Sequence, residues 1–157
     1  MSDRPLFVGI GNAFRRDDGL GPWVAEALAA RGLNAVPHAG DGAGLLDHFA
    51  ASPSVVLIDA TRSGAAAGTL RRLDARAEAI PAEFFHYSTH RFGLAEAVET
   101  ARALGLLPAR LIIYGIEGSD FGAGLGLSAP VQAAATALIT ALIGEGETPR
   151  GSVAQNL

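Results

Sequence analysis

Three acidic residues and one histidine stand out as groups that could perform chemistry together. Asp17 and Asp18 follow a short apolar run near the N-terminus, Asp59 follows a second apolar run, and His90 precedes an amphipathic segment. Nickel and zinc accept nitrogen and oxygen ligands and leave positions open for water or substrate, so two carboxylates and an imidazole would suit such an ion. The chain has no cysteine, which excludes thiolate metal sites, cysteine nucleophiles and disulfides.

The acidic residues also have structural alternatives. Asp17 or Asp18 could cap the helix that follows them, because a carboxylate accepts hydrogen bonds from the unpaired N–H groups of a first turn. Asp59 could cap a turn at Ala60 and Thr61. A carboxylate that directly follows a four-residue apolar run is more often functional in an α/β architecture, and we expect that role for Asp59.

The histidines differ in their promise as ligands. A lone histidine near a helix start, such as His90, is usually a surface residue. His86 is a credible substitute for it, since it lies in the same segment. His38 falls on a weak strand and His48 on a short helix, and both rank low.

Alternating strands and helices are expected to bring these residues together. Apolar runs predict strands at residues 6–10, 35–36, 55–58 and 111–114, with a weaker edge strand at 69–73. Helical spacing predicts helices over 19–31, 45–50 and 93–104, and a last helix from the N-cap Ser128 to Gly144. This order predicts a single three-layer α/β/α domain over residues 1–157, with a twisted, mostly parallel sheet and a flexible tail at 148–157. Ligands of such sheets bind beyond the carboxyl ends of the strands, where the candidate residues lie.

Composition excludes several functional classes. A net charge of −4 without a long basic cluster argues against binding nucleic acid. The N-terminal segment is neither a signal peptide nor long enough to span a bilayer, so we expect a cytoplasmic protein without membrane contact. Gly9 and Gly11 begin a dinucleotide fingerprint, but Phe14 replaces its third glycine and acids follow. P-loop and Gly-x-Ser-x-Gly patterns are also absent from the sequence, and we expect no organic cofactor.

Residues 8–21, VGIGNAFRRDDGLG, resemble the opening motif of hydrogenase maturation proteases. Further matches follow in the same order: LIDA at 57–60, Gly68-Thr69, STHRFGL at 88–94, YGIE at 114–117 and GLS at 126–128. The matches extend over nearly the whole chain. The resemblance implies Asp18, Asp59 and His90 as metal ligands and catalytic residues, with Asp17 as a structural neighbour.

The resemblance also implies a function. The protein would be an aspartic-type endopeptidase that removes a C-terminal extension from a hydrogenase large-subunit precursor once nickel has been inserted. The nickel would belong to the precursor, which would dock on a monomer of this protein, with residues 115–126 as a candidate docking loop. Two alternatives stay open at this point: a generic metal-dependent hydrolase with its own metal, and a noncatalytic assembly chaperone that recognises the metal centre.

Overall fold

Five strands form one sheet in the order β2-β1-β3-β5-β4 in the computed structural model, which describes residues 4–85 and 91–147. β1, β2, β3 and β5 are parallel, and β4 runs antiparallel along β5 at the edge. The strands are β1 (Leu6–Ile10), β2 (Ala35–His38), β3 (Ser54–Thr61), β4 (Leu70–Asp74) and β5 (Arg110–Glu117). The helices are α1 (Leu20–Ala30), α2 (Gly42–Ala51), α3 (Leu94–Leu104) and α4 (Ala129–Glu147), with 3₁₀ turns η1 (Arg16–Gly19) and η2 (Ala82–Phe84).

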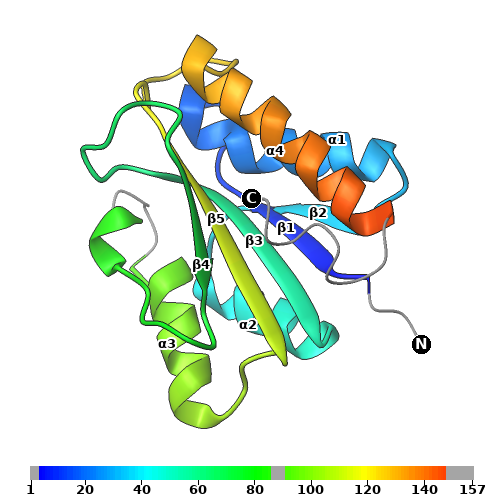
Figure 1. Cartoon of the computed structure of the whole chain (residues 1–157). Helices are drawn as coiled ribbons and strands as arrows, with labels where there is room; N and C mark the ends of the chain where they lie inside the picture. The colour runs from blue at the N-terminus through cyan, green and yellow to red at the C-terminus, as the bar shows by residue number, and fades with distance from the viewer. Residues whose placement is uncertain (1–3, 86–90, 148–157) are drawn as a thin grey trace.

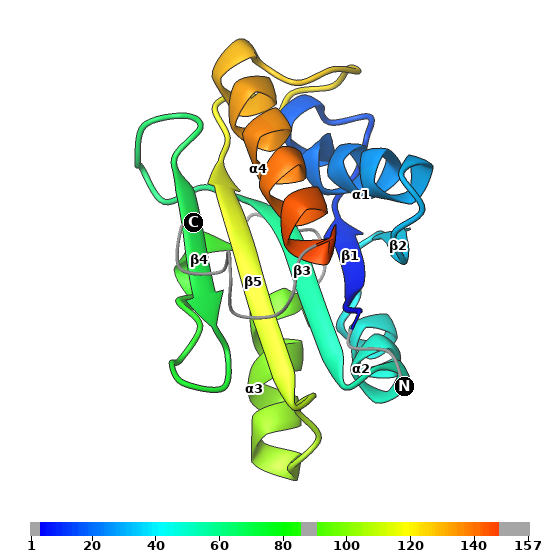
Figure 2. The same ribbon diagram turned by 45° about the vertical axis from the view of Figure 1, so that its right-hand side comes forward.

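Helices cover both faces of the sheet, as Figures 1 and 2 show. α1 and α4 lie on one face, and α2 and α3 lie on the other. Alternate residues of each central strand enter the two cores: Val56 and Ile58 pack with α1 and α4, whereas Val55 and Leu57 pack with α2 and α3. This alternation is expected for strands buried on both sides. The predicted three-layer, mostly parallel architecture is therefore confirmed.

The connection from β1 to α1 depends on close backbone contact. A Cβ atom at Gly11 would overlap the carbonyl of Asp18, and the φ angle of +143° at Gly11 is one that other residues rarely adopt. At the other end of α1, Gly32 has φ +85° and its N–H donates to Ala29 O at 3.0 Å. The predicted C-terminal glycine of this helix is confirmed.

Several predicted boundaries were too narrow. β3 continues three residues beyond Ile58, and β5 continues three residues beyond Tyr114. α2 begins at Gly42 because Asp41 caps it, accepting a hydrogen bond from Gly44 N at 2.8 Å. α4 does not end at Gly144 but continues to Glu147. The predicted tail at 148–157 lies outside the described residues, and within them no helix is long and apolar enough to cross a membrane.

Candidate active site

The candidate carboxylates lie at the end of the sheet that the carboxyl ends of the parallel strands form. In the β1–β3 register, Gly9 lies opposite Ile58, so Asp59 lies beside the end of β1 and the start of the loop that leads to Asp18. The 3₁₀ turn η1, which contains Asp18, contacts β3. The structure thus brings the segments of Asp18 and Asp59 together, as the carboxyl-end rule predicts.

Asp18 is nearly buried, with 8% of its surface exposed. Its carboxylate accepts a hydrogen bond from Asn12 N at 2.9 Å, and its own N–H donates to Arg15 O at 3.0 Å. No side chain caps α1, whose N-cap is Gly19. The capping alternative for the acidic pair is therefore wrong, and Asp18 is instead held across the loop that it closes.

Asp59 is 6% exposed and lies inside β3, not after it. The turn predicted at Ala60 and Thr61 does not exist, since both residues belong to the strand. Asp59 Oδ1 accepts a hydrogen bond from Ala60 N at 2.8 Å. Strand alternation places Asp59 on the α2 and α3 face with Leu57, where it shares an end of the sheet with the start of both helices.

His90 and its substitute His86 both lie outside the described residues, so their place in the site stays a prediction. The described residues after His90 lead into α3, which begins at Leu94. Gly93 N donates to Glu96 at 3.0 Å at the start of that helix, and Phe92 O accepts a hydrogen bond from Gly42 N at 2.6 Å. The segment after His90 is thereby fastened to the N-terminus of α2.

Glu117 is a buried carboxylate that the sequence did not mark as a site residue. It is 3% exposed and accepts hydrogen bonds from the Thr61 hydroxyl at 2.7 Å, from the N–H and hydroxyl of Ser63, and from Gly64 N at 3.0 Å. Burial alone would raise the pKa of Glu117, but these hydrogen bonds lower it below its ordinary value. Glu117 therefore fixes the chain that leaves β3 just after Asp59.

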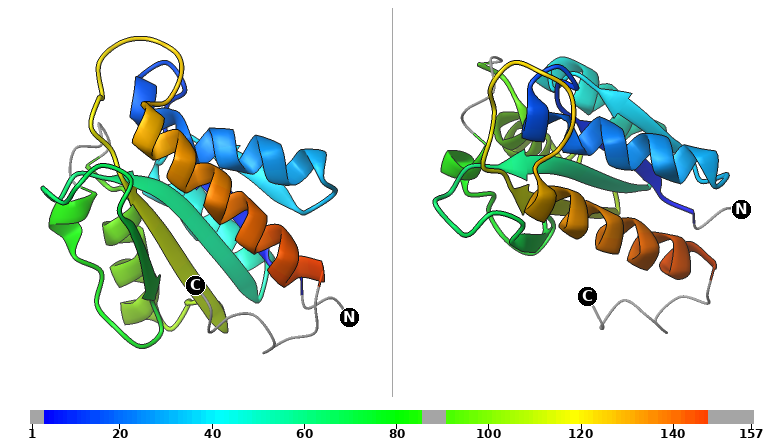
Figure 3. Two further views of the ribbon diagram at one scale, coloured as in Figure 1. Left: turned by 45° about the horizontal axis from the view of Figure 1, so that its top comes forward. Right: turned by 90° about the horizontal axis from the view of Figure 1, so that it is seen from above.

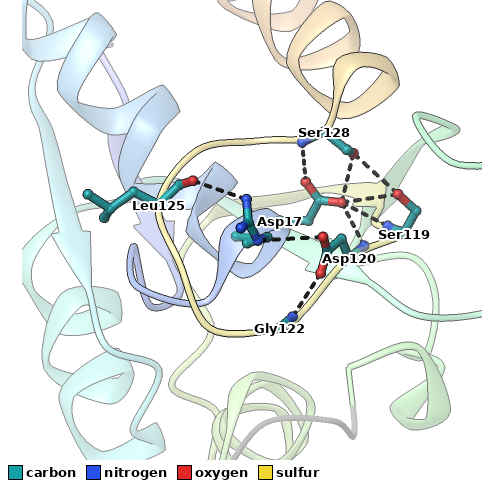
Figure 4. A network of polar contacts seen from close by, with 7 residues as sticks. Asp17, Ser119, Asp120, Gly122, Leu125 and Ser128 are labelled. Carbon is teal, nitrogen blue, oxygen red and sulfur yellow. Dashed lines mark hydrogen bonds and ion pairs between the residues drawn. The ribbon is translucent and has the colours of Figure 1, made fainter.

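Asp17, in the turn η1, has a similar environment. It is fully buried, and its carboxylate accepts hydrogen bonds from Ser119, Asp120 and Ser128 (Figure 4). Burial opposes its ionisation, yet the backbone N–H groups of these three residues and the Ser128 hydroxyl lower the pKa of Asp17. Ser128 directly precedes α4, as predicted for its N-cap, but its hydroxyl donates to Asp17 at 2.8 Å.

The segment 118–128 is tied to the loop after β1. Gly124 N donates to Phe14 O at 2.9 Å, and Gly124 O accepts a hydrogen bond from Arg16 N at 3.0 Å. Figure 3 shows this segment, in yellow, arching beside η1 in both views. Phe14 and Leu125 remain 70% and 66% exposed on the two tied segments. The two tied segments therefore each expose one large apolar side chain.

The low-ranked histidines have local partners. His38 ends β2, and its Nδ1 accepts a hydrogen bond from Gly40 N at 2.9 Å. Its ring lies edge-on to that of His48 in α2, with centroids 5.3 Å apart. These contacts are those of histidines that hold the β2–α2 connection.

The described residues contain only part of a possible metal site. Within 4–85 and 91–147, no three His, Asp or Glu side chains are close enough to hold a metal ion. Asp18 and Asp59 could supply two oxygen donors, and a third ligand would have to come from another segment or from a partner. Carboxylates at this edge could also act as a base toward a water molecule.

Asp18 and Asp59 were predicted as site residues, but Asn12, Glu117 and Ser119 were not, and Ser128 was predicted only as a helix N-cap. A signal was present, because 114–117 and 126–128 belong to the motif matches. What could not be read from the chain was that Ser119 and Ser128 both reach Asp17 across more than 100 residues.

Comparisons with known proteins agree with the motif resemblance. A sequence model of the family described as hydrogenase maturation protease matches residues 34–145. The hydrogenase 2 maturation protease of Escherichia coli K12 is 30% identical over 137 residues, covering 83% of this chain and 82% of that protein. The hydrogenase expression/formation protein HupM of Azotobacter chroococcum is 29% identical, covering 97% and 78%. The structure of the E. coli hydrogenase maturating endopeptidase HybD superposes with a TM-score of 0.68 at 28% identity, covering 91% and 94%.

Proposed function

The chain belongs to the hydrogenase maturation protease family, and on that premise we propose that it is an endopeptidase that removes the C-terminal extension of a nickel-loaded [NiFe]-hydrogenase large-subunit precursor. The observation that carries the proposal is that Asp18 and Asp59, from two separate motif segments, lie together at the carboxyl ends of the parallel strands. The relatives named above are described as a hydrogenase 2 maturation protease and a hydrogenase expression/formation protein.

In this proposal the nickel arrives with the precursor. Asp18, Asp59 and His90 bind the open positions of the ion, while its cysteine ligands stay on the precursor and complete the coordination shell. A site with three ligands and open positions binds a bare ion only modestly. Tight binding of the precursor to this protein therefore requires that the precursor already carries nickel. The ion then holds the scissile bond close to the two aspartates.

Peptide hydrolysis needs a water molecule, a base that takes its proton, and a group that returns a proton to the leaving amine. We propose that the aspartate pair acts as the base, takes the proton of the water molecule and returns it to the leaving amine, in the aspartic-type class that the family resemblance implies. Both aspartates are nearly buried, at 8% and 6% exposure, so charges that develop during the reaction would be little screened by solvent. A cytoplasmic location stays a prediction from the sequence.

The test is the intact mass of a candidate large-subunit precursor before and after incubation with this protein. Nickel-loaded and nickel-free precursors are incubated in parallel. A discrete C-terminal loss confined to the loaded precursor is the expected result. Binding without a change in mass would favour the chaperone alternative, and cleavage of the nickel-free precursor or of small peptides would favour the generic hydrolase.

A further inference from the structure

Five hydrogen-bond donors reach the carboxylate of Asp17, beside the candidate site. Its Oδ1 accepts from Ser128 N at 2.7 Å. Its Oδ2 accepts from Ser119 N and Asp120 N, both at 2.9 Å, from the Ser128 hydroxyl at 2.8 Å and from the Ser119 hydroxyl at 3.4 Å. Both oxygens are engaged and none of the residue's surface is exposed, so Asp17 itself has no free oxygen to offer a metal ion or a water molecule (Figure 4).

The contacts of Asp17 hold the backbone that presents Asp18. Asp17 N donates to Asp120 O at 2.9 Å, so the backbone and the side chain of Asp17 grip the same segment. Asp18 is the next residue in η1, and Asn12 N donates to its carboxylate at 2.9 Å. The peptide that links the two aspartates is thus fixed from residues 118–128 on one side and from Asn12 on the other.

We infer that Asp17 is a positioning residue for the proteolytic reaction: it locks η1 to residues 118–128 and so sets the place of Asp18 in the site. The inference rests on the proposed function, in which Asp18 binds the nickel of the precursor. The two adjacent aspartates thus have different roles. Asp17 is structural, and both of its carboxylate oxygens accept hydrogen bonds. Asp18 binds the nickel, and among the described residues its carboxylate accepts a single hydrogen bond.

Asp17→Asn tests this role because it keeps the shape and adds a donor where donors already point. If the amide nitrogen replaces Oδ1, it faces Ser128 N. If it replaces Oδ2, it faces Ser119 N and Asp120 N. Either orientation places N–H against N–H, so the lock between η1 and the segment loosens.

A milder variant removes part of the lock without touching Asp17. Ser119→Ala with Ser128→Ala deletes two hydroxyl donors and leaves the three backbone donors in place. Ser52→Ala is the matched control. The Ser52 hydroxyl donates to Ser54 O at 2.9 Å at the start of β3, which is the opposite end of the strand from the site. Leu142→Ala controls for lost stability, because Leu142 is 1% exposed in α4 and about 20 Å along that helix from its start.

The experiment measures two quantities per folded molecule: the cleavage rate at saturating nickel-loaded precursor, and the ratio of affinities for nickel-loaded and nickel-free precursor. Asp17→Asn is expected to lower the rate at least tenfold and to reduce the ratio toward that of Asp18→Asn. The double serine variant should fall between it and the wild type. Ser52→Ala and Leu142→Ala should keep both quantities.

An unchanged rate and ratio in Asp17→Asn would overturn the inference while leaving the proposed function intact. If Asp17→Asn does not fold, the double serine variant decides, and wild-type values in that variant would overturn the inference. A wild-type protein that neither cleaves nor prefers the loaded precursor would overturn the proposed function, and this inference with it.

Discussion

Asp59 and Glu117 are buried carboxylates on the same face of neighbouring strands, yet their surroundings differ. Glu117 is surrounded by donors from Thr61, Ser63 and Gly64. Asp59 accepts a hydrogen bond from the adjacent Ala60 N and lies two residues before the end of β3. The hydrogen bonds of Glu117 stabilise the fold, whereas Asp59 lies near the carboxyl end of a parallel strand, where ligands of such sheets bind.

Asp59→Asn is expected to abolish processing while the protein stays folded. The substitution removes the charge but keeps the shape, and the new amide oxygen can still accept from Ala60 N. We expect a loss of at least about 100-fold in cleavage rate, or about 3 kcal/mol of transition-state stabilisation. The measurement is precursor cleavage followed by mass, with urea unfolding as the check on folding. Normal cleavage by this variant would show that the site assignment is wrong.

Glu117→Gln is expected to destabilise the protein in a pH-dependent way. The new amide group must face a backbone N–H in either orientation, which we expect to cost about 2 kcal/mol at neutral pH. The pKa of Glu117 is lowered from its ordinary value of 4.5, so its ionised form stabilises the fold above that pH, and this contribution is lost as pH falls through the lowered pKa.

The difference in unfolding free energy between wild type and Glu117→Gln should therefore be full at neutral pH and shrink below pH 4.5. Urea unfolding at several pH values measures it. Glu26→Gln makes the same chemical change on the exposed face of α1 and should alter stability by less than about 0.5 kcal/mol. A pH-independent difference would contradict the assigned ionisation of Glu117.

At the scale of elements, the alternation of strands and helices and the mostly parallel sheet were predictable from the sequence, and the contacts between distant loops were not. The run at 55–58 predicted β3, but the strand continues through Asp59 because Thr61 pairs with Glu117 on β5. The sequence pattern marks only the apolar residues of a strand, whereas the strand itself continues as far as it is paired with its neighbour. Similarly, helix capping was an alternative for Asp17, and its actual partners could not be predicted because they lie more than 100 residues further along the chain.

The two tied loops provide a surface on which a precursor could dock beside Asp18. Phe14 and Leu125 are exposed there and make no core contribution, so Phe14→Ser with Leu125→Ser should leave the unfolding free energy unchanged within about 0.5 kcal/mol. Under the proposed function, the double variant should raise the precursor concentration at half-maximal rate at least about fivefold, with the saturating rate kept.

Leu104 and Leu106 provide a matched control for that surface. They are 64% and 56% exposed, but they lie where α3 ends and the chain turns toward the start of β5, away from the strand ends that form the site. Leu104→Ser with Leu106→Ser should leave cleavage unchanged at every precursor concentration. Equal effects of the two double variants would indicate a general loss of solubility or stability instead of docking.

At the scale of the whole molecule, the sheet separates two apolar cores and carries the site at one end. Helices α1 and α4 cover one face, and α2 and α3 cover the other. Among the described residues, the candidate carboxylates lie at one end of the strands, with Asp59 near the end of β3 and Asp18 in the turn η1 that follows β1. This arrangement allows the loops to be specialised for one partner without changing the cores. The third metal ligand is therefore expected to come from one of those loops.

The metal content of the purified protein distinguishes a nickel carried by the substrate from a resident metal. Asp18 and Asp59 alone offer two oxygen donors, and even with His90 the site would lack the softer ligands that hold nickel tightly. We therefore expect well under one nickel or zinc ion per chain after dialysis, measured by elemental analysis, and unimpaired cleavage of a preloaded precursor by the dialysed protein. One tightly held ion per chain, lost in Asp18→Asn and needed for cleavage, would instead identify a hydrolase with its own metal.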